Sequence, residues 1–570
     1  MEDFRSKYPC LSRVLSGNIL FFYYLILLIV PNIALCFTEH WSVVAKVANV
    51  FVPLSVYAFI LSGFRNVSKG FLWLYIIAFF AAFQIVLLYL FGRSVIAVDM
   101  FLNLTTTNPG EAMELLDNLL PALVIVFVLY LPPLFISIFM VVKKVNEIKA
   151  RRSLRLLVAR WSFVPAVLSL LCAYIWGGGY SILNELYPVN VGYNIYLAAN
   201  HQYKLHHYDE LSKNFSYQAQ SCRSKDDPEI YVYVIGETSR ADNWSLMGYK
   251  RPTNPLLSTE DGVIAYPFVL SQSNTTHKSV PLLMSYVTAS DYDSVYSAKG
   301  IISAFKEAGF HTAYLSNQKY NHSFIDFFGK EADDVIFIKE MPGIPKDPKD
   351  IDLLPFVRQE LDKGYKKLFI VLHTYGSHFS YKERYPEKDA FFKPDSPVDA
   401  DWRNRPNLIN AYDNSIRYTD KFLHHLIEMI KGEHVSSAML YTSDHGEDIY
   451  DDSRKLFLHA SPVPSYYQIH VPLIVWTSEP FGQEHPDLVH YLKENSLKQI
   501  SSSLSCFQTI LDLSGISTNK SVDSLSLCSG NFKESLPLYL NDHNKPLTFQ
   551  SIGLGKEDFD NLKNNHFRYE

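Results

Sequence analysis

Two short apolar runs, each ending in an acidic residue, carry the side chains best suited to bind a metal. Glu237 follows the run 230–235, and Asp444 with His445 follows the run 438–442. Two carboxylates and an imidazole suit a divalent transition metal, most often zinc, and a site with three protein ligands keeps one position open for chemistry. Taken alone, the same residues are equally compatible with a helix cap and a surface histidine.

Between these two motifs lies a polar loop that could supply a nucleophile. Residues 271–281 contain Thr275 and Thr276 ahead of an apolar run that we expect to be helical. A threonine at a helix N-terminus is well placed to attack phosphorus, because the amide groups and the helix dipole favour an anion there. Considered without other information, either threonine is more often a simple helix cap.

The elements that must position these residues read as alternating strands and helices. We expect strands at 230–235, 311–315, 367–373, 438–442 and 471–476, and helices at 301–308 and 409–430. This alternation predicts an α/β domain with a mostly parallel sheet between helices. Parallel strands end at one edge of such a sheet, where loops and ligands gather.

The first third of the chain is different, because it is dominated by long apolar segments. Five of them are each long enough to cross about 30 Å of hydrocarbon: 18–37, 47–64, 71–91, 119–142 and 161–177. A cleaved signal peptide would account for the first segment alone. We therefore predict a membrane domain over 1–177, a linker over 178–228 and a catalytic domain over 229–570.

The basic residues beside these segments give the orientation. Lysines and arginines lie before the first segment, between the second and third, and densely between the fourth and fifth, over 143–160. Positive charge marks the cytoplasmic side, so five crossings place the C-terminal domain outside. The net charge of −6 argues against nucleic acid as a partner.

Two further features of the sequence remain open at this point. The loop after the third segment carries Asn103, Thr107 and Glu111 at spacings of four, which would share one face of a helical turn. A solvated loop explains the same pattern. In the exported part, Cys506 and Cys528 form our preferred disulfide, although connectivity cannot be read from sequence.

Several motifs taken together resemble the bacterial phosphoethanolamine transferases that modify lipopolysaccharide, within the alkaline phosphatase and sulfatase superfamily. The motifs are Gly-Glu-Thr-Ser-Arg-Ala-Asp at 236–242, the segment 247–255, Thr276 ahead of Ser279-Val-Pro281, His-Thr-Tyr-Gly-Ser-His at 373–378, Ser-Asp-His-Gly-Glu at 443–447, and Leu458-His459. The resemblance extends to five membrane segments followed by an exported domain. It therefore covers nearly the whole chain.

The resemblance implies roles for particular residues. Glu237, Thr276, Asp444 and His445 would bind zinc, as one ion or two, and Thr276 would also be the nucleophile. His373, His378 and His459 would line the substrate phosphate, with charge stabilisation, proton donation and a second zinc as open alternatives. Asn103, Thr107 and Glu111 match the family's lipid-headgroup loop, whereas Asn317 and Gln318 align less closely with its further substrate-binding residues.

The implied reaction takes place at a membrane. Phosphatidylethanolamine would be the donor and lipid A, or another lipopolysaccharide sugar or phosphate, the acceptor. The protein would be a multi-pass protein of the inner membrane with the loop 92–118 and the catalytic domain in the periplasm. One departure concerns the acceptor: the lipid A enzymes flank the nucleophile with a cysteine pair, and this chain has none there.

Other functions compete with this one. A phosphoglycerol transferase of the lipoteichoic acid synthase kind has a similar layout and also uses a metal-bound threonine. A sulfatase is disfavoured because no Cys or Ser stands in a Cys/Ser-x-Pro-x-Arg context. A membrane scaffold without activity would require all of these coincident motifs to be structural.

Overall fold

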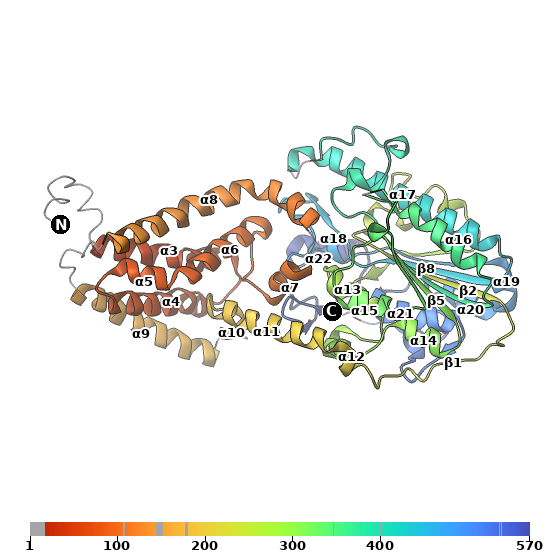
Figure 1. Cartoon of the computed structure of the whole chain (residues 1–570), viewed down its shortest axis with the longest axis horizontal. Helices are drawn as coiled ribbons and strands as arrows, with labels where there is room; N and C mark the ends of the chain where they lie inside the picture. Colours follow the sequence, from red (N-terminus) through yellow and green to blue (C-terminus); the bar gives the residue numbers. More distant parts are fainter. Residues whose placement is uncertain are drawn as a thin grey trace. The chain divides into compact units, whose positions relative to one another are not determined.

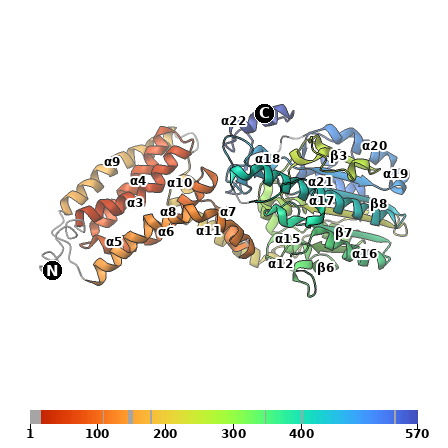
Figure 2. The same cartoon turned by 90° about the horizontal axis from the view of Figure 1, so that it is seen from above.

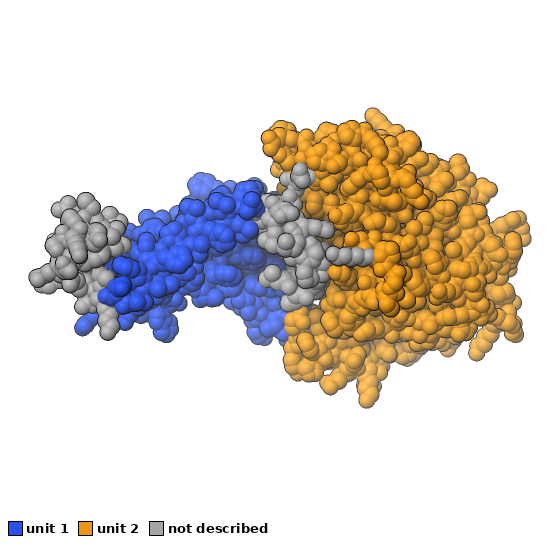
Figure 3. Space-filling view, turned by 45° about the horizontal axis from the view of Figure 1, so that its top comes forward, with its two compact units in different colours: residues 1–201 blue, residues 202–570 orange. Residues whose placement is uncertain are grey.

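The computed structural model describes residues 17–106, 109–143, 152–176, 180–345, 347–398, 401–534, 536 and 538–569. The chain divides into two compact units, 1–201 and 202–570 (Figure 3). The division falls within α11 (Val189–His206), inside the segment 178–228 that we predicted to be a linker.

Unit 1 consists of apolar helices. Four of its described helices are long and apolar enough to span a membrane: α3 (Gly17–Thr38), α4 (Val43–Gly63), α8 (Pro109–Val142, over 120–142) and α9 (Arg152–Trp176, over 152–175). A fifth span is formed if α5 (Val67–Trp73) and α6 (Tyr75–Phe91), which meet at 61°, count as one. The predicted helical membrane domain is confirmed, and its third segment is a bent pair.

Buried amides tie these helices together. Asn32 on α3 donates a hydrogen bond to Oδ1 of Asn49 on α4 at 3.1 Å and another to the carbonyl of Tyr187 at 2.8 Å. Both asparagines are fully buried. Because an unsatisfied polar group is costly among apolar side chains, these bonds fix the register of α3 against α4.

Unit 2 is built on a seven-stranded sheet with the order β3-β11-β8-β2-β7-β5-β6. The strands are β2 (Glu229–Gly236), β3 (Val263–Tyr266), β5 (His311–Ser316), β6 (Asp334–Phe337), β7 (Lys367–His373), β8 (Ser436–Ser443) and β11 (Leu473–Thr477). The five from β8 to β6 are parallel, and β11 is antiparallel to both its neighbours. The predicted mostly parallel sheet is confirmed.

Helices cover both faces of this sheet (Figures 1 and 2). Tyr231, Tyr233 and Ile235 of β2 pack in one core with α13 (Thr276–Leu283), α14 (Ile301–Glu307), α15 (Phe324–Gly329) and α21 (Ser502–Leu513). The alternate residues of β2 pack in a second core with α16 (Leu354–Asp362) and α17 (Arg405–Lys431). Burial on both faces explains why the strand reads as an unbroken apolar run.

Shorter elements complete unit 2 and the segment before it. They are α10 (Ile182–Glu185), α12 (Tyr208–Leu211), α18 (Tyr466–Ile469), α19 (Glu479–Glu484), α20 (Pro486–Glu494) and α22 (Lys556–Asn564), with the two-stranded pairs β1 (Gln220–Ser221) with β13 (Ile516–Ser517), β4 (Val269–Leu270) with β12 (Ile500–Ser501), β9 (Asp448–Ile449) with β10 (Phe457–Leu458), and β14 (Tyr539–Leu540) with β15 (Pro546–Leu547).

The predicted disulfide between Cys506 and Cys528 is wrong. Both thiols are free and buried in the core that α21 shares with the sheet. The Cys528 sulfur lies 3.9 Å from the carbonyl oxygen of Thr509. Each cysteine therefore serves as a small apolar side chain, for which sequence spacing gives no signal.

Candidate metal centre and active site

Adjacent parallel strands bring the two acidic motifs together. β2 and β8 are neighbours in register, with Gly236 opposite Ser443. Glu237 and Asp444 follow directly, so both carboxylates leave the same edge of the sheet from neighbouring positions. Gly376, in the loop after β7, packs against the backbone of Glu237: with φ of +49°, a Cβ there would lie 2.5 Å from the Glu237 carbonyl oxygen. Only glycine allows this close approach.

Glu237, Asp444 and His445 form a compact cluster of potential metal ligands. Their ligand atoms all lie within 4.8 Å of one another. Nε2 of His445 lies 3.5 Å from Oε1 of Glu237 and 3.3 Å from Oδ2 of Asp444. All three side chains are buried. Two buried carboxylates and one imidazole nitrogen facing a common point fit a divalent cation such as zinc.

Surrounding groups fix the orientation of the cluster. Nδ1 of His445 faces the Gly446 carbonyl at 2.9 Å, so this nitrogen carries the proton and Nε2 keeps its lone pair for a metal. Burial lowers the pKa of His445 to about 4, against the opposing effect of Asp444, so the ring is neutral near pH 7. The amides of Thr238 and His445 donate to Oδ1 of Asp444 at 3.1 and 2.7 Å.

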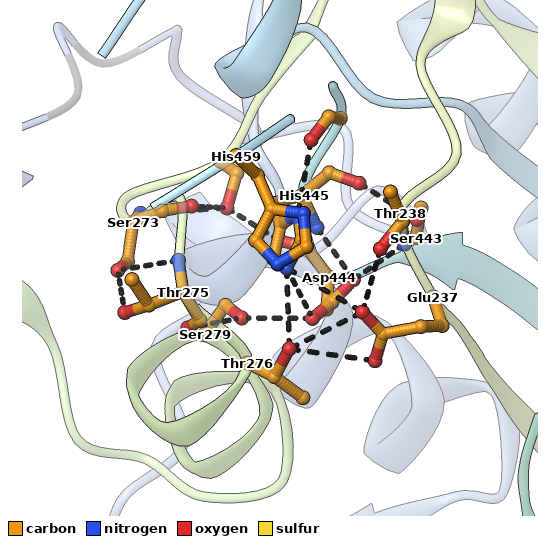
Figure 4. A network of polar contacts seen from close by, with 12 residues as sticks. Glu237, Thr238, Ser273, Thr275, Thr276, Ser279, Ser443, Asp444, His445 and His459 are labelled. Carbon is orange, nitrogen blue, oxygen red and sulfur yellow. Dashed lines mark hydrogen bonds and ion pairs between the residues drawn. The ribbon is translucent and has the colours of Figure 1, made fainter. Parts of the chain in front are cut away.

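Thr276 is the first residue of α13, and its hydroxyl points into the cluster (Figure 4). The Oγ1 atom lies 3.2 Å from Oε1 of Glu237 and 3.2 Å from Nε2 of His445. Thr275 occupies the helix-cap position and its hydroxyl lies 3.2 Å from that of Ser273 instead. Of the two threonines left open by the sequence, Thr276 is the one in the cluster. The helix N-terminus behind it favours negative charge at this point.

Two of the predicted histidines are held beside the cluster. The rings of His459 and His445 lie 4.3 Å apart between centroids, and those of His378 and His459 lie 5.7 Å apart. Nδ1 of His459 contacts Oε1 of Glu447 at 3.0 Å, and Nδ1 of His378 contacts the Phe379 carbonyl at 2.7 Å. Burial lowers the pKa of His378 well below its usual value, with a further contribution from His459.

His373 approaches from the end of β7. Its Nδ1 atom lies 3.1 Å from the hydroxyl of Tyr314, and its buried Nε2 atom makes no hydrogen bond to the described residues. Burial lowers the pKa of His373 to about 4, and the Asp444 carboxylate opposes this shift. A neutral ring with one open nitrogen can accept a proton from the substrate and return that proton in a later step.

Three residues with no role in the sequence analysis support these side chains. Ser279, one turn after Thr276, donates to Oδ2 of Asp444 at 3.3 Å. Glu447 holds His459, and burial raises the pKa of Glu447 to about 8. Tyr314 holds His373. Glu447 belongs to a motif that the sequence analysis quoted, whereas Tyr314 lies in an ordinary strand and gives no local signal.

The other predicted substrate residues fall in different places. Gln318 donates to Oε2 of Glu237 at 3.4 Å and to the Thr374 carbonyl at 2.9 Å, so it borders the cluster. Asn317 instead donates to Oδ1 of Asp350 at 2.8 Å and braces a loop. In unit 1, Thr107 lies outside the described residues. Asn103 lies in α7 (Val98–Thr106) and Glu111 in α8, and their side chains are also outside the described part.

The sulfatase family matches residues 229–516, half of the 570-residue chain, and this range contains every cluster residue named above. The chain belongs to the sulfatase family. This confirms the resemblance to the alkaline phosphatase and sulfatase superfamily. Membership describes the fold of the domain, and its reaction has to be argued from the residues of the site.

Similar proteins include phosphoethanolamine transferases. The chain is 29% identical over 303 residues to phosphoethanolamine transferase EptA of Salmonella typhimurium, covering 51% of this chain and 54% of EptA. The chain thus matches about half the length of this curated relative.

Two solved structures have the same fold. The integral membrane protein lipooligosaccharide phosphoethanolamine transferase A of Neisseria meningitidis has a TM-score of 0.69 at 23% identity, over 90% of this chain and 98% of that one. The periplasmic domain of EcEptC from Escherichia coli, in complex with Zn, has a TM-score of 0.54 at 23% identity, over 60% and 97%. The likeness to both structures concerns the fold, and unit 1 of this chain contributes the helices that are long and apolar enough to cross a membrane.

Proposed function

We propose that this protein transfers phosphoethanolamine from phosphatidylethanolamine to lipid A, or to another sugar or phosphate of lipopolysaccharide, through a covalent intermediate on Thr276. The observation that carries this proposal is the position of the Thr276 hydroxyl, 3.2 Å from both Glu237 and His445 at the start of α13. Similarity to proteins named phosphoethanolamine transferases supports the same reaction class.

Glu237, Asp444 and His445, with Thr276 at the open position, would hold zinc. When bound, zinc lowers the pKa of a hydroxyl and offsets negative charge on a phosphoryl group. The neutral His445 ring needs no further proton change to serve as a ligand near pH 7. We propose that this cluster holds one zinc ion.

In the first step the Thr276 oxygen forms a bond to the donor phosphorus, and the bond from phosphorus to the diacylglycerol oxygen breaks. The Thr276 proton passes to a nearby base, and the leaving oxygen takes up a proton to give diacylglycerol. In the second step an acceptor oxygen attacks the same phosphorus, and Thr276 leaves and regains its proton. Each step needs one acid and one base, which His373, His378 and His459 can supply.

In unit 1, the spacing of Asn103, Thr107 and Glu111 supports a site for the lipid headgroup. An amide, a hydroxyl and a carboxylate are suited to a phosphate and an ammonium group on the same molecule. This assignment depends on the sequence pattern alone.

The test is labelling of the full-length protein with phosphatidylethanolamine that carries an isotope in its headgroup. We expect mass spectrometry to find a phosphoethanolamine adduct on Thr276. Thr276→Ala should abolish the adduct, whereas the control Thr275→Ala should keep it, because the neighbouring hydroxyl lies outside the cluster.

Labelling that persists in Thr276→Ala would remove the assigned nucleophile. A second arm supplies phosphatidylglycerol, the donor expected for a phosphoglycerol transferase. An adduct from that lipid in place of phosphatidylethanolamine would replace the proposed donor. Mass spectrometry of lipid A from cells with and without the gene then tests the acceptor.

A further inference from the structure

Two cations lie on one aromatic ring at the catalytic edge of the sheet. Nζ of Lys339 is 3.1 Å from the ring centroid of Tyr375, and the guanidinium carbon of Arg384 is 4.3 Å from the same centroid. The Tyr375 ring stacks on His378, with centroids 5.1 Å apart and planes 14° apart. Both charges therefore lie within a few ångströms of a ring that touches a candidate active-site histidine.

Three separate loops hold this group in place. Lys339 lies in the 3-10 turn η5 (Ile338–Glu340) after β6, and Arg384 ends the turn η7 (Tyr381–Arg384). The Tyr375 amide donates to Oδ1 of Asp350 at 2.8 Å, which fixes the loop after β7. Because β6 and β7 are parallel members of one sheet, their loops meet at the edge that carries the metal cluster.

The Arg384 guanidinium is largely buried, yet some of its N–H groups make no hydrogen bond to the described residues. Its side chain is 9% exposed. Nε donates to the Ser380 carbonyl at 3.2 Å and Nη2 to Oε2 of Glu383 at 3.2 Å. Nη1 makes no hydrogen bond to the described residues. A guanidinium with one edge open is suited to a phosphate or a carboxylate.

The carboxylates that contact this group leave the open edge of Arg384 in place. Asp350 is engaged by the amides of Tyr375 and Gly376 and by the Asn317 side chain. Glu383 is 57% exposed and makes a single bond to Arg384. An exposed pair of this kind contributes little and can give way to a bound anion.

We propose that Lys339 and Arg384, held on the ring of Tyr375, bind an anionic group of the acceptor, a phosphate or a carboxylate, beside His378. The proposal rests on the proposed function, because it assigns the acceptor side of that site. The donor headgroup is zwitterionic, and these two cations repel its ammonium, whereas an acceptor phosphate or carboxylate presents negative charge without that ammonium. The pair thus sets a preference for acceptors that carry negative charge.

The kinetic test compares one acceptor glycolipid with and without its phosphate, using the full-length protein. In the double variant Lys339→Gln/Arg384→Gln we expect KM for the phosphorylated acceptor to rise at least about 10-fold, the effect of losing one charge-assisted contact. KM for the dephosphorylated acceptor should change less than about twofold, because that molecule offers these cations no charge. Equal changes with both acceptors, or no change with either, would overturn the proposal.

The matched control is Lys520→Gln, which removes another lysine from the face of a tyrosine. Its Nζ lies 4.4 Å from the ring of Tyr286, in a different part of unit 2. This variant should leave the ratio of the two KM values as in the wild type. A ratio altered as strongly by Lys520→Gln would show that general charge, and not this pair, sets the preference.

A binding test separates this proposal from the proposed function. We would titrate full-length Thr276→Ala with glucosamine 1-phosphate, glucuronic acid and uncharged glucosamine. Binding of an anion that is lost in Lys339→Gln/Arg384→Gln supports the site, and the two anions tell phosphate from carboxylate. Failure of both anions to bind overturns it. A wild-type protein that binds the anion and forms no adduct on Thr276 would reject the proposed function alone.

Discussion

Asp444 is positioned by hydrogen bonds from neighbouring N–H and O–H groups, and an asparagine side chain could accept some of the same bonds. Oδ1 receives the amides of Thr238 and His445, and Oδ2 receives the Ser279 hydroxyl. In Asp444→Asn, the amide oxygen can keep the first two bonds while one negative charge is lost. We expect the protein to fold and its zinc affinity to fall by more than the roughly 10–100-fold that loss of an outer-shell partner costs.

The measurement is zinc content after dialysis against a chelator series, with circular dichroism to confirm folding. Asp452→Asn is the control, because Asp452 lies in the turn between β9 and β10 and pairs with Arg454. Unchanged zinc binding in Asp444→Asn would remove this carboxylate from the metal centre.

At the level of single residues, the sequence predicted the group that forms the cluster. Glu237 and Asp444 could be placed because each follows a strand-like run, and His445 follows Asp444 directly. Lys339 and Arg384 could not be placed, because their proximity depends on loops far apart in a chain whose local pattern there is ordinary. Contacts of this kind arise only from the tertiary fold.

At the level of elements, the turn after β8 tolerates little change at Gly446. A Cβ at this position would lie 2.1 Å from the Tyr467 carbonyl oxygen and 2.9 Å from Cβ of Arg240. Both neighbours are closely packed, so Gly446→Ala must displace the turn that carries His445. We expect a loss of about 1–3 kcal/mol in unfolding free energy, together with weaker zinc binding.

Gly482→Ala is the control for this change, because a Cβ at Gly482 in α19 meets nothing within 4 Å. Alanine should be neutral or slightly stabilising there. Chemical denaturation monitored by circular dichroism measures both variants. Equal stability of Gly446→Ala and the wild type would show that the turn can relax.

Glu331 connects elements that are distant in sequence and makes their contact depend on pH. It accepts hydrogen bonds from Tyr208 of α12 and from Gly300 and Ser303 at the start of α14. Burial raises the pKa of Glu331 from 4.5 to about 7. The folded state therefore binds the proton more tightly than the unfolded state, and stability from this group is present below pH 4.5 and lost as pH rises toward 7.

Glu331→Gln should remove the dependence of the unfolding free energy on pH that comes from this group. The difference in unfolding free energy between wild type and variant should change by about 1–3 kcal/mol between about pH 4.5 and 7, and stay constant above about pH 8. Denaturation at a series of pH values measures it, with the exposed Glu494→Gln as control. A difference that does not vary with pH would assign Glu331 a purely packing role.

The elements themselves were predictable where burial is uniform. β2, β7 and β8 lie inside the sheet and read as apolar runs, and α17 shows a long helical pattern. The break between α5 and α6 at Leu74 was not predicted, because apolar residues continue through it. The free thiols of Cys506 and Cys528 show the same limit, since spacing does not reveal which way a side chain faces.

At the level of the whole molecule, the two units carry different parts of the proposed reaction. Every residue of the metal cluster and the three candidate histidines belong to unit 2, which has its own cores on both faces of its sheet. Asn103, Thr107 and Glu111 belong to unit 1. Chemistry at phosphorus and capture of a lipid headgroup from a bilayer should therefore be separable.

We expect residues 202–570 alone to bind zinc with the stoichiometry of the full chain and to form the Thr276 adduct from a water-soluble, short-chain phosphatidylethanolamine. With the same headgroup presented in vesicles, the rate should fall on the order of 100-fold or more relative to the full chain, because the isolated unit lacks the apolar helices that would keep it at a bilayer. Adduct mass spectrometry measures both rates. Thr276→Ala in the isolated unit provides the background, and equal vesicle rates for the unit and the full chain would show that unit 1 contributes nothing to lipid capture.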